Sequence, residues 1–301
     1  MELFKDKRKA IFISLFCMFL WGSAIPMIKM QYEFLSIVKG DIGSRLLVAG
    51  IRFFIAGLIT IFYFKIFNRE EKVDFKNLNY RFLIKIALLQ ITLHYIFYYT
   101  GLFYTKGVKA SVIQSFNAFI IVIFSALLIK GDGLNKRKLL ALCIGTIGII
   151  YVNSGGDLST SFSLLGEGAI IMAITLNGLA TVLVKKEGAG INSFVISTFQ
   201  FCVGCIPLIV IGLMLKQTVW TINIKGILLI IYGGFVSSTA FTLWYMVLKN
   251  QSAGEFGIYK LFVPIFGSIL SVIILGEDFN IRLLIGFIMV IIGVLVLNKK
   301  L

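Results

Sequence analysis

Charged residues and prolines are scarce in this sequence of 301 residues. Only 14% of the residues are charged and 58% are hydrophobic, whereas soluble domains carry roughly 25% charged residues. A water-soluble core stops growing near about 250–300 residues, so it could not hide this apolar excess. High hydrophobicity excludes a disordered chain, and only three prolines exclude a proline-rich linker protein. An integral membrane protein remains.

Motifs for several kinds of chemistry are also missing. The sequence has no G-x-x-x-x-G-K-[ST] segment for ATP, no H-E-x-x-H segment for a catalytic metal and no G-x-S-x-G segment for a serine hydrolase. Cys202 and Cys205 have the spacing of a zinc or redox pair, but no second pair accompanies them, so we interpret them as small apolar side chains. We therefore expect no metal, no other cofactor and no catalytic residue.

Apolar segments near the length of about 20 residues that crosses a bilayer divide the chain. They are continuously apolar, whereas the strands of a membrane barrel alternate, so we predict an all-α polytopic membrane protein with ten transmembrane helices. The stretch Met1–Ala24 has the composition of a signal peptide, but its apolar run continues to Ile28, which favours a membrane helix. The predicted spans are 10–30, 46–67, 81–104, 110–129, 137–153, 164–184, 191–215, 224–248, 255–275 and 281–298.

Positive charge dominates the charged residues: 29 Lys and Arg face 14 Asp and Glu, for a formal net charge of +15. In a soluble protein this excess would suggest nucleic acid binding. With ten spans and a cytoplasmic N-terminus, the inside segments hold more than twice as many Lys and Arg residues as the outside segments. We therefore predict a multi-pass protein of the plasma (inner) membrane with both termini in the cytoplasm and no nucleic acid partner.

The two halves of the sequence resemble each other. Gly131, Gly148 and Asn153 match a glycine, a glycine and an asparagine that each lie 145 positions later, and the segment 21–29 resembles 177–185. Each half holds five spans, an odd number, so the second half must enter the membrane from the opposite side, as in the inverted repeats of many secondary transporters. The predicted domains are a first repeat at 1–153, a linker at 154–163 and a second repeat at 164–301.

These halves also carry a family resemblance. The Trp-Gly-Ser segment 21–23, Arg52 early in the second span and the run 254–294 that contains Pro264 are similar to EamA-type carriers of the drug/metabolite transporter (DMT) superfamily. The resemblance covers nearly the whole chain and implies a ten-helix carrier that exports or imports small metabolites such as amino acids, without an ATPase domain. The sequence departs from the family at Phe119, which aligns with Pro264, and at Asp132, where the family has glutamate.

Ionisable side chains inside membrane spans are costly and often functional, and the predicted spans contain Arg52, His94 and Lys260. Lys260 precedes Pro264 by four residues, and we interpret it as a ligand for a carboxylate or phosphate. Its long stem also allows the alternative that it reaches the membrane interface. Arg52 has the same two interpretations, because a guanidinium binds a carboxylate in a forked geometry.

Polar and aromatic side chains near these positions complete the predicted substrate site. Gln90, His94 and Tyr98 share one helix face and would line a wet cavity, with His94 as a base or proton carrier. The alternative is a hydrogen bond between helices. The whole predicted site consists of Trp21, Arg52, Gln90, His94, Tyr98, Gln114, Asn117, Asn177, Gln200, Trp244, Tyr259 and Lys260.

These features predict a secondary transporter that exports a small metabolite, such as an amino acid or another carboxylate, across the plasma membrane by alternating access. The middle of each predicted span lacks Asp and Glu, which favours facilitated diffusion or exchange over ion coupling. Two alternatives stay open: an intramembrane enzyme that acts on a lipid-linked substrate, and a channel. We expect a small-molecule substrate and the lipid bilayer as partners, and a monomer or homodimer.

Overall fold

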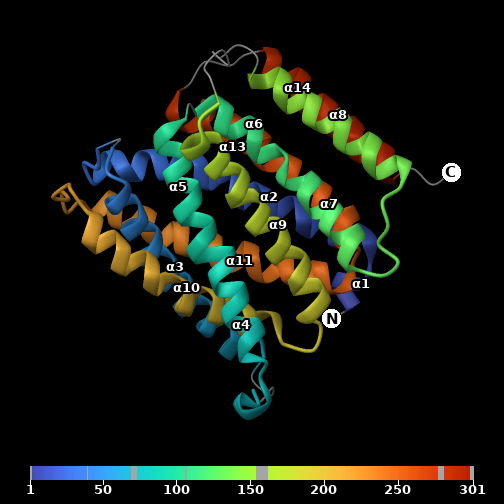
Figure 1. The fold of residues 1–301 in the computed structure, drawn as a ribbon, viewed down its shortest axis with the longest axis horizontal. Coiled ribbons are helices and arrows are strands. Elements are labelled where there is room, and N and C mark those ends of the chain that lie inside the picture. Colours follow the sequence, from blue (N-terminus) through green and yellow to red (C-terminus); the bar gives the residue numbers. More distant parts are fainter. Residues whose placement is uncertain are drawn as a thin grey trace.

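The computed structural model describes residues 2–38, 40–68, 73–105, 107–153, 162–276 and 281–298. Within these ranges all regular elements are helices (Figure 1), which confirms the predicted all-α fold. The α-helices are α1 (Glu2–Lys5), α2 (Lys7–Phe34), α3 (Ile42–Phe67), α4 (Tyr80–Ala87), α5 (His94–Tyr104), α6 (Gly107–Ser115), α7 (Asn117–Leu128), α8 (Lys136–Asn153), α9 (Ala169–Glu187), α10 (Ser193–Leu215), α11 (Ile224–Asn250), α12 (Ala253–Gly257), α13 (Phe262–Leu275) and α14 (Ile281–Asn298). Short 3₁₀ or π segments are η1 (Phe75–Asn77), η2 (Leu88–Leu93), η3 (Leu164–Gly168) and η4 (Ile258–Leu261).

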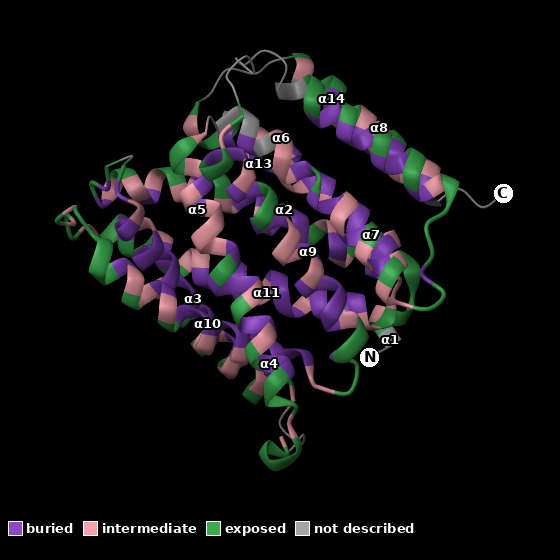
Figure 2. Cartoon of the chain, viewed as in Figure 1, coloured by how far each residue is buried: buried purple, intermediate pink, exposed green. Residues whose placement is uncertain are grey.

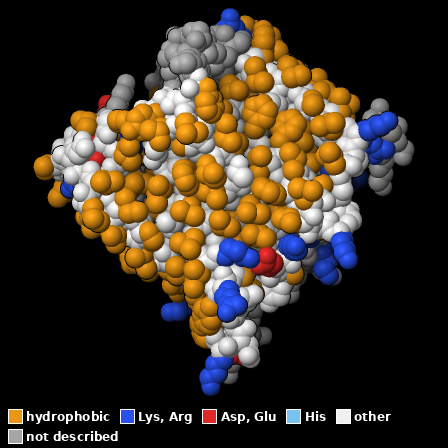
Figure 3. Space-filling view, viewed as in Figure 1, with side chains coloured by type: hydrophobic (Ala, Val, Ile, Leu, Met, Phe, Trp, Pro, Cys, Tyr) orange, Lys and Arg blue, Asp and Glu red, His pale blue; other side chains and the backbone are white. Residues whose placement is uncertain are grey.

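Long apolar helices dominate the molecule. In the described part of the chain, seven helical stretches of 23 to 28 residues are long and apolar enough to cross a membrane, and shorter apolar helices cover Val112–Leu128 and Leu284–Leu297. Buried residues lie on the inner faces of the helices (Figure 2). Large apolar side chains such as Phe12 and Leu213 are exposed on the outside, and apolar side chains cover much of the face seen in Figure 3. This surface suits lipid contact.

Glycines allow helices from the two halves of the chain to pack closely. A Cβ atom on Gly22 would lie 2.9 Å from the backbone nitrogen of Gly267, which pairs α2 with α13. A Cβ atom on Gly212 would lie 2.5 Å from the backbone nitrogen of Leu47, which pairs α10 with α3. A Cβ atom on Gly148 would lie 2.9 Å from the carbonyl oxygen of Gly286, which pairs α8 with α14. These two helices lie side by side in Figure 1. Small residues allow this backbone approach between membrane helices.

Besides the stretch that contains the π segment η2, two of the helical stretches are broken partway along their length. The α6–α7 stretch is interrupted at Phe116, and the α12–α13 stretch contains the 3₁₀ turn η4 at Ile258–Leu261. Phe116 and Leu261 lie 145 positions apart, which is the offset between the two halves of the sequence. Interrupted helices in corresponding positions often mark the substrate site of a transporter, and both breaks lie beside the cavity described next.

Candidate functional site

A cavity of about 660 Å³ lies between α2, α3, α5, α9, α11 and the two broken stretches, within the usual size range of small-molecule sites. Lys29 and Glu33 at its edge are exposed on α2, whereas Arg52 and His94 in its wall are buried. The cavity therefore extends inward from the C-terminal half of α2. Its wall contains eight of the twelve predicted site residues: Trp21, Arg52, His94, Tyr98, Gln114, Asn117, Asn177 and Lys260.

The ammonium group of Lys260 is held by two amides from other helices. Its Nζ donates to Oδ1 of Asn177 at 2.8 Å and to Oδ1 of Asn117 at 3.3 Å. Nδ2 of Asn117 donates to the carbonyl of Ile174 at 2.9 Å, which turns Oδ1 of Asn117 toward the lysine. The ammonium also lies 5.5 Å from the centre of the Trp21 ring, a cation–π contact. An ammonium has three donors, so one stays available for a ligand.

The local chain direction explains why Lys260 points into the cavity. Pro264 has no backbone N–H to donate to the carbonyl of Lys260, and the preceding turn tightens into η4. The tighter turn changes the helical register, and Phe256, four residues before Lys260, is fully buried in the core. Lys260 contacts Asn117 and Asn177 rather than extending toward the membrane interface.

Arg52 lies in an aromatic part of the wall. It is 4% exposed, and its Cζ lies 4.7 Å from the ring centre of Phe53 and 5.5 Å from that of Tyr95. Its Nε is buried without a hydrogen-bond acceptor. A Cβ atom on Gly233 would lie 2.6 Å from Cδ of Arg52, so this glycine makes room for the arginine stem. The guanidinium therefore faces the cavity and does not reach a lipid headgroup.

His94 begins α5 directly after the π segment η2. Its Nδ1 lies 2.9 Å from the carbonyl oxygen of Ala173. A carbonyl only accepts, so Nδ1 donates, and in the neutral ring Nε2 is left as an acceptor. The ring stacks on Tyr98 with 5.9 Å between ring centres. Gln90 is 1% exposed and lies outside the cavity wall, because the wider π turn rotates it away from the face of His94 and Tyr98.

Three further predicted residues pack behind the wall. Trp244 makes an edge contact with Trp21, with 6.1 Å between ring centres. Gln200 accepts a hydrogen bond of 2.5 Å from Tyr245. Tyr259 is 1% exposed within the aromatic core. It stays a prediction that a substrate directly contacts Gln90, Gln200, Trp244 and Tyr259. Trp244 also fixes the ring of Trp21, which lies against the ammonium group of Lys260.

The cavity wall also contains residues outside our predicted site. Lys29 and Glu33 belong to α2, which continues to Phe34, and Arg45 belongs to α3, which begins at Ile42 rather than at residue 46. Tyr95 and Tyr99 neighbour Tyr98 in the wall. Because Tyr95 and Tyr99 are four residues apart, they share one face of the helix, and this spacing could have identified them from the sequence. The wall therefore combines four Lys or Arg residues with a single carboxylate, that of Glu33. Among the described residues, no group of three or more His, Cys, Asp or Glu side chains could hold a metal ion.

Known proteins resemble the chain along its whole length. The uncharacterized transporter YetK of Bacillus subtilis (strain 168) is 27% identical over 98% of this chain and 89% of its own length. The uncharacterized transporter YvbV of the same organism is 25% identical over 98% of this chain and 93% of its own length. A crystal structure with 16% sequence identity matches 97% of both chains with a TM-score of 0.82, which shows a shared fold.

The EamA-like transporter family model matches residues 8–154 and again residues 164–299. These two matches include both broken helical stretches and every described residue of the cavity wall. The chain therefore belongs to the EamA-like transporter family, as its resemblance to carriers of the DMT superfamily indicated.

Proposed function

We propose that this membrane transporter moves a small metabolite that carries an anionic group, such as an amino acid or another carboxylate, through the cavity by alternating access. The observation that carries the proposal is the charge of the wall, where Lys29, Arg45, Arg52 and Lys260 outnumber Glu33. Burying a charge without a counter-charge is costly, so an anionic substrate would stabilise Arg52 and Lys260 when it binds. Asn117 and Asn177 hold the lysine in place for it.

We propose ten membrane helices in two inverted repeats, with boundaries at 1–153 and 164–301. Helical segments occupy all ten predicted ranges, and the family model matches once in each half. The linker 154–163 falls mostly on residues 154–161, which lie outside the described residues. Cysteine labelling of Lys136→Cys and Asp157→Cys tests this topology. The proposal predicts opposite sides of the membrane, and labelling of both from one side would exclude it.

The orientation that we propose places both termini in the cytoplasm and the protein in the plasma membrane. The excess of Lys and Arg in the corresponding loops supports it. In this orientation the cavity edge at Lys29 and Glu33 faces the outside. Export is the direction of transport that we propose, and the resemblance to EamA-type carriers is compatible with it.

A carrier fits the cavity better than the two alternatives. The wall reaches Lys260 and Pro264 but includes no residue of the α2 segment before Trp21 or of α12, so the cavity does not extend to that end of the molecule as a channel would. The wall contains one histidine and no serine beside it that would form a nucleophile–base pair for an enzyme. Facilitated diffusion or exchange remains our proposed mode, because Glu33 is at the exposed edge.

Counterflow in proteoliposomes tests the function directly. We expect saturable, trans-stimulated uptake of a carboxylate substrate, such as glutarate or an amino acid. Lys260→Gln and Arg52→Gln should each reduce it about tenfold or more, because each removes a charged hydrogen-bond donor. Lys76→Gln, which removes one exposed charge in η1 outside the cavity wall, is the matched control and should transport normally. Unchanged transport in both cavity variants would contradict the proposed site.

A further inference from the structure

The charges of Arg52 and Lys260 are both left without a carboxylate. In the described part of the chain, the ion pairs involve neither residue. Lys260 bonds only neutral amide oxygens, and Arg52 lies over aromatic rings with Nε unpaired. The buried Arg52 and the partly buried Lys260 repel each other in one cavity, and each loses solvation. A ligand with a single negative charge would neutralise one of them and leave the other uncompensated.

The two cations belong to different walls of the cavity. Lys260 is fixed by residues of α7 and α9, whereas Arg52 on α3 lies against Tyr95 of α5. Between them α5 presents His94, whose ring is 4.7 Å from Tyr95 and is bonded to α9 through Ala173. The wall between the two cations is therefore largely aromatic. A ligand would need one anionic group at each end and an apolar or aromatic middle.

We propose that the substrate is a small organic dianion whose two anionic groups, carboxylate or phosphate, bind Lys260 and Arg52 respectively. This inference rests on the proposed anion transport and narrows it. A zwitterion suits the cavity less well, because its ammonium group would lie beside one of the two cations. The carboxylate of Glu33 is at the exposed edge of the cavity and is separated from Lys260 by three helical turns of α2 up to Trp21.

A set of matched ligands tests the number of charges. The purified full-length protein in proteoliposomes is given labelled glutarate, and unlabelled competitors are glutarate, its monomethyl ester and 5-aminopentanoate. We expect glutarate to compete about tenfold better than either analogue, because each analogue lacks one charged contact. A comparison of glutarate with 3-phosphonopropionate, which carries one phosphonate and one carboxylate, shows whether one of the two cations prefers a phosphate-like group to a carboxylate. Equal competition by the monomethyl ester would overturn the inference and leave anion transport intact.

Two variants make the test specific for the two cations. In Lys260→Gln and in Arg52→Gln, one cation remains, so the advantage of glutarate over its monomethyl ester should disappear. In Lys76→Gln the advantage should persist. A preference that survives in both cavity variants would contradict the assignment of the two anionic groups. If no anion is transported by the wild-type protein, the proposed function itself fails, which is a distinguishable result.

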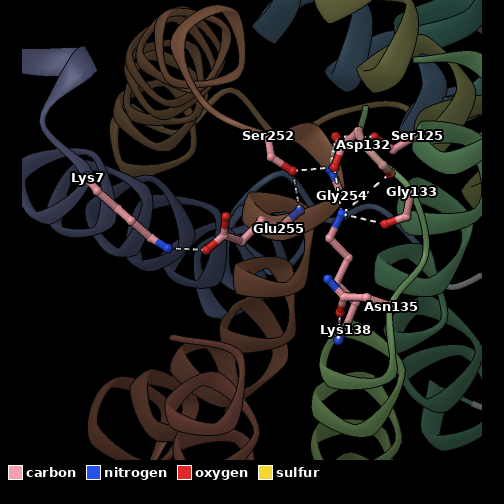
Figure 4. A network of polar contacts seen from close by, with 9 residues as sticks. All are labelled: Lys7, Ser125, Asp132, Gly133, Asn135, Lys138, Ser252, Gly254 and Glu255. Carbon is pink, nitrogen blue, oxygen red and sulfur yellow. Dashed lines mark hydrogen bonds and ion pairs between the residues drawn. The ribbon is translucent and has the colours of Figure 1, made fainter. Parts of the chain in front are cut away.

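A second inference comes from the end of the molecule that the cavity does not reach, where Asp132 accepts hydrogen bonds from four residues (Figure 4). Ser125 Oγ and Lys138 Nζ donate to it at 2.5 and 2.6 Å. Ser252 Oγ and the backbone N–H of Gly254 donate at 2.5 and 3.0 Å. We call these five residues the Asp132 cluster. It connects the α7–α8 corner with the beginning of α12, which belong to different halves of the chain.

The same short segment carries the cluster and the substrate site. Gly254 and Lys260 are six residues apart on the continuous α12–η4 segment. Lys7 forms an ion pair with Glu255, and Gln251 donates to the carbonyl of Phe4 at 2.8 Å, so the N-terminus also holds this segment. We propose that the Asp132 cluster closes this end of the cavity and must open during alternating access, with α12–η4 linking it to Lys260. This inference also rests on the proposed function.

Cysteine accessibility tests the closure without requiring transport. Ser237→Cys, in the cavity wall, is introduced into a variant with Cys17, Cys143, Cys202 and Cys205 replaced by serine. A membrane-impermeant thiol reagent is then applied to the side of the membrane that bears Lys7. Asp132→Asn should raise the labelling rate from this side about fivefold or more, because each lost hydrogen bond weakens closure, whereas Asp74→Asn, at an exposed cap of η1, should not.

Ser252→Ala is a milder second variant for the case that Asp132→Asn unfolds. It removes one donor to Asp132 and should raise labelling to a smaller extent. An unchanged labelling rate in every variant that remains folded, as judged by thermal unfolding, would overturn the inference.

Discussion

Asp132 and Asp41 are buried carboxylates at opposite ends of α2, and different donors surround them. Asp41 accepts from the amides of Ser44, Gln217 and Thr218 and from the hydroxyl of Ser44; we call these residues the Asp41 cluster. It joins the start of α3 to the segment after α10, so each cluster connects the two halves of the chain. Only the Asp132 cluster contains a cation, Lys138.

The difference has a mechanical meaning. The Asp41 cluster is built largely from backbone amides, which cannot leave without moving the main chain. The Asp132 cluster is built from side chains and one amide, so rotation of Ser252 or Lys138 can dissolve most of it. We infer that the Asp41 end is the more rigid of the two, although the cavity is exposed on that side.

Asp132→Ala should have the largest effect on stability. It leaves Lys138, which is 7% exposed, as a buried cation without a counter-charge, and we expect a loss of about 3–5 kcal/mol in the free energy of unfolding. The double variant Asp132→Ala/Lys138→Met should recover about half of that loss. Denaturant unfolding in detergent measures both. A double variant no more stable than Asp132→Ala would show that the ion pair does not distinguish the two clusters.

Gly43→Ala should have the next largest effect, at the other end. Its Cβ atom would overlap the backbone of Leu215, which cannot move away easily beside Asp41, so we expect a loss of about 2–3 kcal/mol. Gly254→Ala is the matched change in the Asp132 cluster. Its Cβ atom would lie 3.1 Å from Oδ1 of Asp132, a side-chain atom that can shift, so the loss should be under about 1 kcal/mol. Equal losses at the two glycines would argue against the difference in rigidity.

Acid should weaken both clusters. Burial raises the pKa of each carboxyl, but the accepted hydrogen bonds outweigh it, so the pKa of Asp132 falls to about 2 and that of Asp41 falls well below its usual value. A carboxylate with a lowered pKa contributes its full stabilisation above about pH 4 and progressively less as the pH falls toward 2. Wild type should therefore lose about 2 kcal/mol more than Asp132→Asn between pH 5 and pH 2. If the unfolding temperatures of wild type and Asp132→Asn fall by the same amount as the pH is lowered, this expectation is contradicted.

Lys7→Ala should have the smallest effect. The ion pair between Lys7 and Glu255 is partly exposed, at 49% and 24% of the two side chains, and such pairs contribute about 0–1 kcal/mol. We expect a loss below about 1 kcal/mol, reduced further at high salt. Urea unfolding at low and high ionic strength measures it. A loss comparable to that of Asp132→Ala would place the main closure at the N-terminus instead.

The sequence predicted most of the helical segments because long apolar runs are a simple physical signal. It also indicated Arg52 and Lys260, since charges in such runs are rare. It did not predict that Asn117 and Asn177 meet at one ammonium group, because their positions depend on the breaks at Phe116 and at Ile258–Leu261. Pro264 marks a disturbed turn before it, but the local sequence pattern does not show that this turn is a 3₁₀ segment.

The missed wall residues have a similar cause. Arg45 and Glu33 lie outside the predicted spans, because the apolar runs are shorter than the helices that contain them. A regular helix would place Gln90 on the face of His94, but the π segment Leu88–Leu93, which contains Gln90, changes the register. Gly233 carries no such signal in the sequence, since its role depends on the stem of Arg52 that packs against it.

The position of Trp21 along α2 has an electrical consequence. α2 has 28 residues and is therefore about 42 Å long, more than the hydrocarbon thickness of about 30 Å, and Trp21 with its bound Lys260 lies near its middle. A substrate at that level has about half of the membrane voltage on either side. Each uncompensated charge that crosses the whole membrane changes energy by about 2.3 kcal/mol per 100 mV. With a negative interior, the voltage alone would drive an organic anion outward, and a dianion with twice the force.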